Sequence, residues 1–239
     1  MSETIYTIPI NEVFDECAAD HSRGCPFCRL YNKWEANQID LLLGASMMEP
    51  DVRIQTNKKS FCPTHFDQLL AAKNRLGLGL ILESHLDQLR REVNDGALSA
   101  LLGKVGTAAP RRLSQVDDSC YICSRIEYDF SRMLSNAVAL WSEESEFRAK
   151  VKNQPYLCLP HFRMWLEVAQ RELKRGYADF YREVSEPVYA YFDSLREDVS
   201  WFCKKFDYRY DSEPWGNAKD AVDRARKFLC ADLHKPIYS

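Results

Sequence analysis

Cys25-Pro26-Phe27-Cys28 and Cys62-Pro63-Thr64-His65 are the two stretches that best explain the rest of this chain. In each, two metal-binding side chains are separated by two residues, so one turn of backbone presents both to the same point. Such CxxC and CxxH pairs are the half-sites from which structural zinc sites are built. A single pair would be weak evidence, because buried free thiols are common in protein cores.

The same two half-sites occur a second time, as Cys120-Tyr121-Ile122-Cys123 and Cys158-Leu159-Pro160-His161. The offset between the copies is 95 residues for the first half-site and 96 for the second, so one residue has been inserted between them. Residues 49–53 and 144–148 also correspond at an offset of 95. Two complete sets in register are hard to produce by chance and indicate an internal duplication.

We expect each copy to close its own metal site, with three thiolates and one imidazole around the ion. The first predicted site consists of Cys25, Cys28, Cys62 and His65. The second predicted site consists of Cys120, Cys123, Cys158 and His161. Four protein ligands fill a tetrahedral zinc ion and leave no position for a reactive water, so both Cys₃His sites are expected to be structural.

Two Zn²⁺ ions are the expected cofactors, and iron–sulfur clusters, which use the same residue types, are the alternative. Three thiolates leave a zinc site with one net negative charge, so Arg53 and Arg148 are predicted to lie beside the sites as compensating charges. Cys17 and His21 are close enough in sequence to compete for the first ion. We interpret Cys17 as a core residue and His21 as a turn residue.

The composition is that of a globular protein and argues against several functional classes. Hydrophobic residues make up 46% of the chain and aromatic residues 12%, which argues against general disorder. A net charge of −3 provides no excess of positive charge to attract nucleic-acid phosphates. Neither CxxC pair is followed by a basic helix of the kind that enters a DNA groove. The longest apolar run, residues 76–82, is too short to cross a bilayer, so no membrane partner is expected.

Cysteine usage points to a reducing compartment. The first ten residues lack the basic start and apolar core of a secretion signal. Nine cysteines in such a chain, six of them in matched half-sites, favour metal chemistry over a disulfide framework. A cytoplasmic location is therefore expected.

The chain is predicted to be mainly α, because no alternating apolar run is long enough to require a sheet. Two duplicated helical lobes are expected at residues 1–103 and 104–206, each organised by one Cys₃His site, with a C-terminal strap and helix at 207–239. The boundary is placed in residues 103–110, which are rich in glycine and alanine.

Two predicted helices contain residues that disfavour a regular helix, namely glycine in one and proline in the other. A single long helix is predicted from residue 66 to 93, and Gly77 and Gly79 inside it each cost about 1 kcal/mol relative to alanine. We therefore expect a close helix crossing at these glycines. Pro187 is expected to interrupt the corresponding helix of the second copy.

The loop at residues 206–220 has little periodicity and concentrates Tyr208, Arg209 and Trp215 among charges of both signs. Tyrosine, tryptophan and arginine supply most of the binding energy at protein interfaces, so this loop is a candidate ligand or partner surface. The competing interpretation is a strap that covers the ends of the helices, with Tyr208 and Trp215 as apolar plugs.

Six segments together carry a family resemblance. They are Thr7-Ile8-Pro9-Ile10-Asn11-Glu12, Cys25-Pro26-Phe27-Cys28, Phe61-Cys62-Pro63-Thr64-His65-Phe66, Asn74-Arg75-Leu76-Gly77-Leu78-Gly79-Leu80, Phe206-Asp207-Tyr208-Arg209 and Pro214-Trp215-Gly216-Asn217. The chain resembles an uncharacterised bacterial family, a domain of unknown function with duplicated CxxC…CxxH motifs. The resemblance covers nearly the whole chain and implies a bacterial cytoplasmic protein, but it supplies no catalytic residues.

The leading functional hypothesis is a zinc-binding, non-enzymatic interaction or adaptor protein with an unidentified protein partner. One alternative is an iron–sulfur or thiolate-based protein that responds to redox state or metal. Another is an enzyme with a pocket between the lobes near residues 207–216, although no catalytic triad order, phosphate loop or carboxylate pair stands out. Metal analysis with an absorption spectrum would separate the first two hypotheses.

Overall fold

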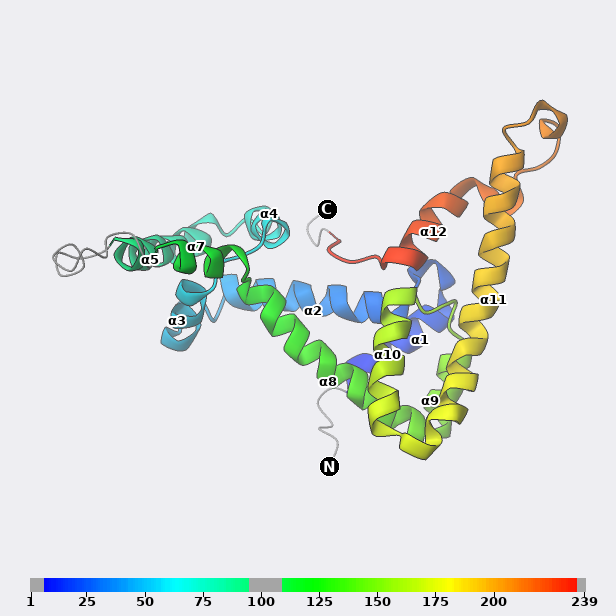
Figure 1. The fold of residues 1–239 in the computed structure, drawn as a ribbon, viewed down its shortest axis with the longest axis horizontal. Coiled ribbons are helices and arrows are strands. Elements are labelled where there is room, and N and C mark those ends of the chain that lie inside the picture. Colours follow the sequence, from blue (N-terminus) through cyan, green and yellow to red (C-terminus); the bar gives the residue numbers. More distant parts are fainter. Residues whose placement is uncertain (1–6, 95–108, 236–239) are drawn as a thin grey trace. The chain divides into compact units, whose positions relative to one another are not determined.

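The computed structural model describes residues 7–94 and 109–235, and every regular element in these ranges is a helix (Figure 1). The mainly α fold predicted above is therefore confirmed. In chain order the α-helices are α1 (Thr7–Ala19), α2 (Pro26–Leu43), α3 (Pro50–Lys58), α4 (Pro63–Ala71), α5 (Arg75–Val93), α7 (Ala109–Asp117), α8 (Tyr121–Glu143), α9 (Ser145–Lys152), α10 (Leu159–Glu172), α11 (Tyr177–Lys204) and α12 (Ala221–Cys230). Short 3₁₀ helices are η2 (His21–Arg23), η3 (Lys174–Gly176), η4 (Tyr208–Tyr210) and η5 (Gly216–Asp220).

The chain forms two compact units, and neither is one of the halves expected from the sequence. The described residues of the first unit are 7–32 and 130–233, and those of the second are 33–94, 109–129 and 234–235. The division falls inside α2, after Asn32, and inside α8, after Asp129. Each unit therefore contains residues from both copies of the duplication. The expected lobes at 1–103 and 104–206, with a separate strap at 207–239, do not match these units.

The first unit is built around a cluster of aromatic side chains that have no exposed surface. Phe14 of α1 lies 5.4 Å from Phe27 of α2 and 4.9 Å from Phe147 of α9, measured between ring centroids. Trp165 of α10 lies 5.1 Å from Phe27 and 4.8 Å from Phe180 of α11. Burying a large side chain of this kind contributes roughly 2–3 kcal/mol. This cluster fixes the start of α2 and the start of α10 in the same core.

The second unit contains a break that the sequence reading missed. The helix expected at residues 66–93 is divided into α4 and α5, and Lys73 between them takes a left-handed conformation with φ 62°. Asn74 then caps α5, because its side-chain oxygen accepts a hydrogen bond from the amide of Gly77 at 2.9 Å. The expectation of one continuous helix was therefore wrong.

Only one of the two glycines in α5 is packed closely. A Cβ atom at Gly77 would lie 2.9 Å from the Asn74 amide nitrogen and 3.0 Å from the Met47 sulfur, so a side chain would disturb the cap. A Cβ atom at Gly79 would meet nothing within 4 Å. Gly77 is thus close-packed, but against the helix cap and the turn after α2 rather than at the predicted helix crossing, and the expectation was wrong for Gly79.

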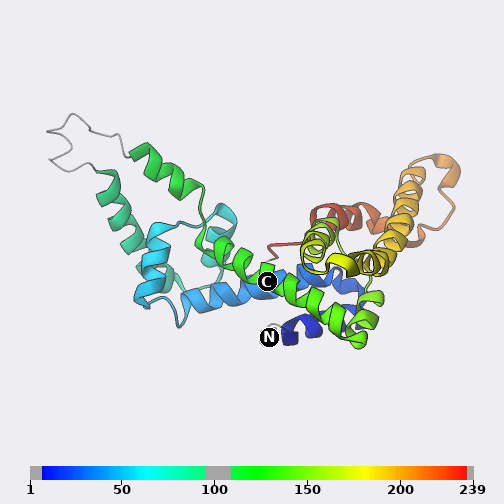
Figure 2. The same ribbon diagram turned by 60° about the horizontal axis from the view of Figure 1, so that its bottom comes forward.

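Pro187 does not interrupt a helix. The break after α10 comes earlier, at residues 173–176, where Lys174 has a positive φ of 45°. Beyond it, α11 is a single helix from Tyr177 to Lys204 with Pro187 inside it. It lies side by side with α12 in both ribbon views (Figures 1 and 2).

Candidate metal centres

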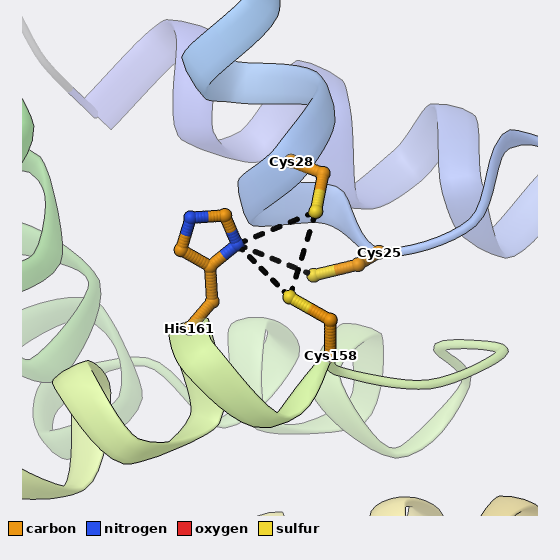
Figure 3. A group of neighbouring side chains, drawn as sticks. All are labelled: Cys25, Cys28, Cys158 and His161. Carbon is orange, nitrogen blue, oxygen red and sulfur yellow. Dashed lines mark hydrogen bonds between the residues drawn. The ribbon is translucent and has the colours of Figure 1, made fainter. Parts of the chain in front are cut away.

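The first candidate metal centre joins the start of α2 to the start of α10. Figure 3 shows Cys25 and Cys28 facing Cys158 and His161. The sulfur of Cys28 lies 3.5 Å from the sulfur of Cys158 and 3.4 Å from Nδ1 of His161. The Nδ1 atom is also 3.2 Å from the Cys158 sulfur and 3.9 Å from the Cys25 sulfur. All four side chains are buried.

The second metal centre joins the start of α8 to the start of α4. It consists of Cys62, His65, Cys120 and Cys123. Nδ1 of His65 lies 3.1 Å from the sulfur of Cys62 and 3.3 Å from the sulfurs of Cys120 and Cys123. The sulfurs of Cys62 and Cys123 are 3.8 Å apart. Here Cys62 and Cys123 are partly exposed.

The structure therefore forms two Cys₃His groups from the eight predicted residues but pairs the half-sites differently. We expected each CxxC to meet the CxxH of its own copy, and this pairing was wrong. The 18 residues of α2 span about 27 Å, and the nine residues of α3 span only about 14 Å. After Cys28 the chain therefore travels too far to return within its own copy. The CxxC of each copy meets the CxxH of the other.

Helix starts place the ligands in both centres. Cys62 and Cys158 are the N-cap residues of α4 and α10, each with extended backbone and a proline in the first turn. Proline is favoured there because it lacks the N–H that the first turn would leave unpaired. Backbone amides also reach the sulfurs, from Cys123 to Cys120 at 3.5 Å and from Asp232 to Cys28 at 3.4 Å. Such donors stabilise thiolates.

In each set of cysteines the protein contacts lower the pKa of one thiol and raise the pKa of at least one neighbouring thiol. Burial raises the pKa of Cys25, but hydrogen bonds with Cys158, Cys28 and His161 outweigh it and lower that pKa well below the usual value. The hydrogen bond with Cys123 lowers the pKa of Cys120 to about 3. The pKa values of Cys28, Cys158 and Cys123 are raised, chiefly because each shares a proton with a neighbouring sulfur. A divalent cation would relieve this crowding of sulfur ligands.

The histidine of the second centre has an additional partner that sequence reasoning missed. Nε2 of His65 lies 3.1 Å from Oε1 of Glu35, and both side chains are fully buried. The same carboxylate accepts a hydrogen bond from Gln68 at 2.9 Å and contacts Nδ1 of His234 at 2.6 Å. A carboxylate on the outer nitrogen of a metal-binding histidine fixes the ring and strengthens the ligand.

Protonation within this group follows the same contacts. Burial raises the pKa of Glu35, but hydrogen bonds with His234, His65 and Gln68 outweigh it and lower the pKa to about 2. Burial lowers the pKa of His65, but hydrogen bonds with Cys120 and Glu35 raise it to about 10. Glu35 is therefore a buried anion at neutral pH. The sequence indicated this position only by spacing. Glu35 stands four residues before Ile39, so both side chains lie on the same buried face of α2.

Of the two predicted arginines, Arg148 has its contacts at the end of α8, and the role predicted for Arg53 stays a prediction. Arg148 donates to the carbonyl oxygens of Trp141 at 2.6 Å and Ser142 at 3.0 Å, and its guanidinium lies 4.4 Å from the Trp141 ring. It therefore closes the end of α8. Arg53 has a buried Nη1 atom without a hydrogen-bond partner among the described residues. The expected compensating charge at the metal is not supplied by Arg148.

Two other candidates stand apart from the first centre. Cys17 is fully buried in α1, and burial raises the pKa of its thiol to about 12. His21 lies exposed in η2. Neither belongs to the groups of metal-binding side chains found among residues 7–94 and 109–235. Their interpretation as core and turn residues agrees with these positions.

The loop after α11 is ordered by a buried lysine. Lys205 donates to the carbonyl oxygens of Tyr210 at 2.5 Å, Asp211 at 3.2 Å and Glu213 at 2.8 Å. Its ammonium also lies 5.5 Å from the centre of the Trp215 ring. Tyr208 is 82% exposed, so it is not the apolar plug considered above, whereas Trp215 is partly covered.

Residues 1–236 match one family model, described as a family of unknown function (DUF6062). No curated protein and no solved structure matches the chain. In the part of the chain that is described, no helix is both long enough and apolar enough to span a membrane.

Proposed function

The chain belongs to DUF6062, a family of unknown function, and we propose that it is a zinc-binding, non-enzymatic interaction protein with two structural Cys₃His sites. The observation that carries this proposal is that three cysteines and one histidine, four potential ligands, converge in each centre. A tetrahedral ion with four protein ligands has no open position for water or substrate, so each ion would hold helices together rather than catalyse a reaction.

The spacing of the ligand atoms favours a single ion in each centre. All ligand atoms of a centre lie within 4.8 Å of one another. With a Zn–S distance of about 2.3 Å, sulfurs at the corners of a tetrahedron lie about 3.8 Å apart, close to the 3.5 and 3.8 Å found here. An iron–sulfur cluster would hold its cysteines further apart, because several irons and sulfides lie between them. Zinc–thiolate sites also suit a reducing compartment, which supports a cytoplasmic location.

The proposed partner surface is the loop fixed by Lys205. Phe206 is 75% exposed and Tyr208 is 82% exposed, although both are large side chains that normally bury surface. Because three backbone carbonyls are already held by Lys205, this loop would lose little conformational entropy on binding. Exposed aromatic residues on a preordered loop are typical of protein-binding hot spots.

Elemental analysis of anaerobically purified protein tests the metal assignment. We expect two zinc ions per chain and no visible absorption band. A brown protein containing iron and sulfide would overturn the zinc proposal.

The interaction proposal is tested with a Phe206→Ser/Tyr208→Ser double variant in a cross-linking pull-down from the native host. The variant should keep both zinc ions and lose partners that the wild type captures. Unchanged capture would contradict the proposed surface.

A further inference from the structure

The two metal centres arose from one duplicated motif, yet they are protected differently. In the first centre Cys25, Cys28 and Cys158 are 2%, 5% and 0% exposed. In the second centre Cys62 and Cys123 are partly exposed, and these two sulfurs lie 3.8 Å apart. A reagent in solvent can therefore reach a pair of neighbouring sulfurs only a small movement from disulfide distance.

The histidines also differ, and the difference traces to one pair of equivalent positions. Glu35 in the first copy corresponds to Phe130 in the second at the 95-residue offset. Glu35 lies against Nε2 of His65 in the second centre, whereas the ring of Phe130 lies 5.2 Å from the ring of His161 in the first. Phe27 adds a second aromatic ring 6.2 Å from His161. The histidine of the first centre therefore lies beside two aromatic rings, and the histidine of the second lies beside an anion.

These differences act on sulfur reactivity in the same direction. A buried carboxylate beside the ligand histidine adds negative charge, which makes bound thiolates more electron-rich and more nucleophilic. In the first centre the Asp232 amide donates to the Cys28 sulfur at 3.4 Å, and a hydrogen bond to sulfur withdraws electron density. The corresponding amide bond of the second centre goes to Cys120 at 3.5 Å, which is not one of the two partly exposed sulfurs. Both the solvent exposure of its cysteines and the nearby negative charge of Glu35 therefore favour oxidation at the second centre.

We propose that Cys62 and Cys123 form an oxidation site that responds to hydroperoxides by releasing the second metal ion, while the first ion stays bound. This inference rests on the proposed occupation of both centres by zinc. The protein would then keep one metal ion permanently, whereas an oxidant would release the other ion and thiol reductants would restore its binding site.

Oxidation of the two thiolates to a disulfide needs only one peroxide molecule and two protons. The Cys123 thiolate attacks one peroxide oxygen, the O–O bond breaks, and the sulfur becomes a sulfenic acid while hydroxide leaves. The Cys62 thiolate then attacks that sulfur, forms the S–S bond and expels a second hydroxide. Two electrons pass from the two sulfurs to the peroxide, and two protons convert both hydroxides to water. Zn²⁺ then leaves, because only Cys120 and His65 still bind it.

The test treats the zinc-loaded full-length protein with hydrogen peroxide and follows zinc release with a chromophoric chelator. Peptide mass spectrometry after alkylation identifies the disulfide. We expect one of two zinc equivalents to leave at least tenfold faster than the other, together with a Cys62–Cys123 disulfide, and dithiothreitol with zinc should restore the protein. Equal release of both ions, or first oxidation of Cys28 or Cys158, would overturn the inference. Protein that binds no zinc would instead refute the proposed function.

A matched pair of variants isolates the role of Cys62. Cys62→His keeps four zinc ligands in the second centre but removes one sulfur of the proposed disulfide, and Cys203→His makes the same change at an exposed cysteine outside both centres. Peroxide-driven release from the second centre should slow at least tenfold in Cys62→His and stay unchanged in Cys203→His. Release from Cys62→His at the wild-type rate would exclude Cys62. If either variant fails to fold, the wild-type disulfide map still decides.

Discussion

His65 connects the second metal centre to the surrounding protein through both of its ring nitrogens. Nδ1 faces the three sulfurs, and Nε2 faces the buried Glu35 carboxylate. Gln68 and His234 hold that carboxylate from two further directions. Because the ring is fixed by contacts that do not involve the metal, the site is preorganised, and less conformational entropy is lost when an ion binds.

Replacing Glu35 by glutamine should therefore weaken the second centre alone. Glutamine keeps the size of the side chain but removes its charge, so zinc affinity there should fall about 10- to 100-fold. Competition with a chromophoric chelator measures the two affinities. Glu127→Gln, an exposed change on α8, is the control and should leave both unchanged. An equal loss at both centres would contradict the assignment of Glu35 to His65.

The first centre should bind zinc less tightly as pH falls. The pKa values of Cys28 and Cys158 are raised by their shared protons, so both thiols are protonated at neutral pH. Zinc must displace at least these two protons, and its apparent affinity should fall about 100-fold for each unit of decreasing pH between 8 and 6. Chelator competition at several pH values measures the slope. A pH-independent affinity would show that the thiols are already ionised.

At the level of single residues, the ligands could be predicted and their supporting contacts could not. The eight cysteines and histidines follow a fixed spacing twice, and this regularity needs no knowledge of the fold. Glu35 and His234 are 199 residues apart and meet only because the chain returns to the same place. The sequence around Lys205 contains no pattern that predicts a lysine bonded to three backbone carbonyl groups.

Among the elements, the loop after α11 depends on Lys205 more than on regular hydrogen bonding. The amides of Tyr210, Asp211 and Glu213 bond to carbonyls three residues earlier, which gives isolated turns. Lys205 supplies the interactions that tie these turns together, and it is one of the few buried charges of the first unit. The loop therefore keeps its shape although several of its side chains face solvent.

Lys205→Met should open this loop without unfolding the first unit. Methionine keeps the length of the side chain but leaves three carbonyls without a cationic donor, at a cost of about 2 kcal/mol. The free energy of local opening should fall by that amount, so amide exchange at Tyr210, Asp211 and Glu213 should become about 30-fold faster. Lys204→Met, the exposed neighbour, should change these rates little. Equal effects of the two variants would remove the special role of Lys205.

Helix lengths explain why the eight predicted side chains gather into two groups but pair differently from the prediction. The sequence pattern indicated helices after each CxxC, but the pairing depends on how far those helices carry the chain. The 23 residues of α8 span about 35 Å, and the eight residues of the following α9 cannot reverse that distance. A contact between equivalent positions is also present, since Trp34 Nε1 donates to Asp129 at 3.0 Å. The two copies meet each other rather than folding separately.

For the molecule as a whole, crossed pairing means that each Cys₃His group joins the two sequence halves. Each group takes two side chains from residues 1–101 and two from residues 102–239, so a bound ion would link the halves. A structural zinc contributes roughly 10–16 kcal/mol of apparent binding free energy at neutral pH, which is as large as the whole stability of a typical domain, about 5–15 kcal/mol. Neither half should therefore fold without the other, although each carries one complete set of motifs.

Coexpression of residues 1–101 and 102–239 as two chains tests this organisation. We expect them to purify as one complex with two zinc ions, and each alone to be insoluble or free of tightly bound zinc. Native mass spectrometry gives the stoichiometry.

The sharper experiment is Cys158→Ser in the second fragment. Crossed pairing predicts that Cys25 and Cys28, in the other fragment, then become reactive toward iodoacetamide, because they lose the ion that Cys158 helped to hold. If Cys120 and Cys123 became reactive instead, each copy would be closing its own site, and the arrangement of both metal centres described above would be wrong.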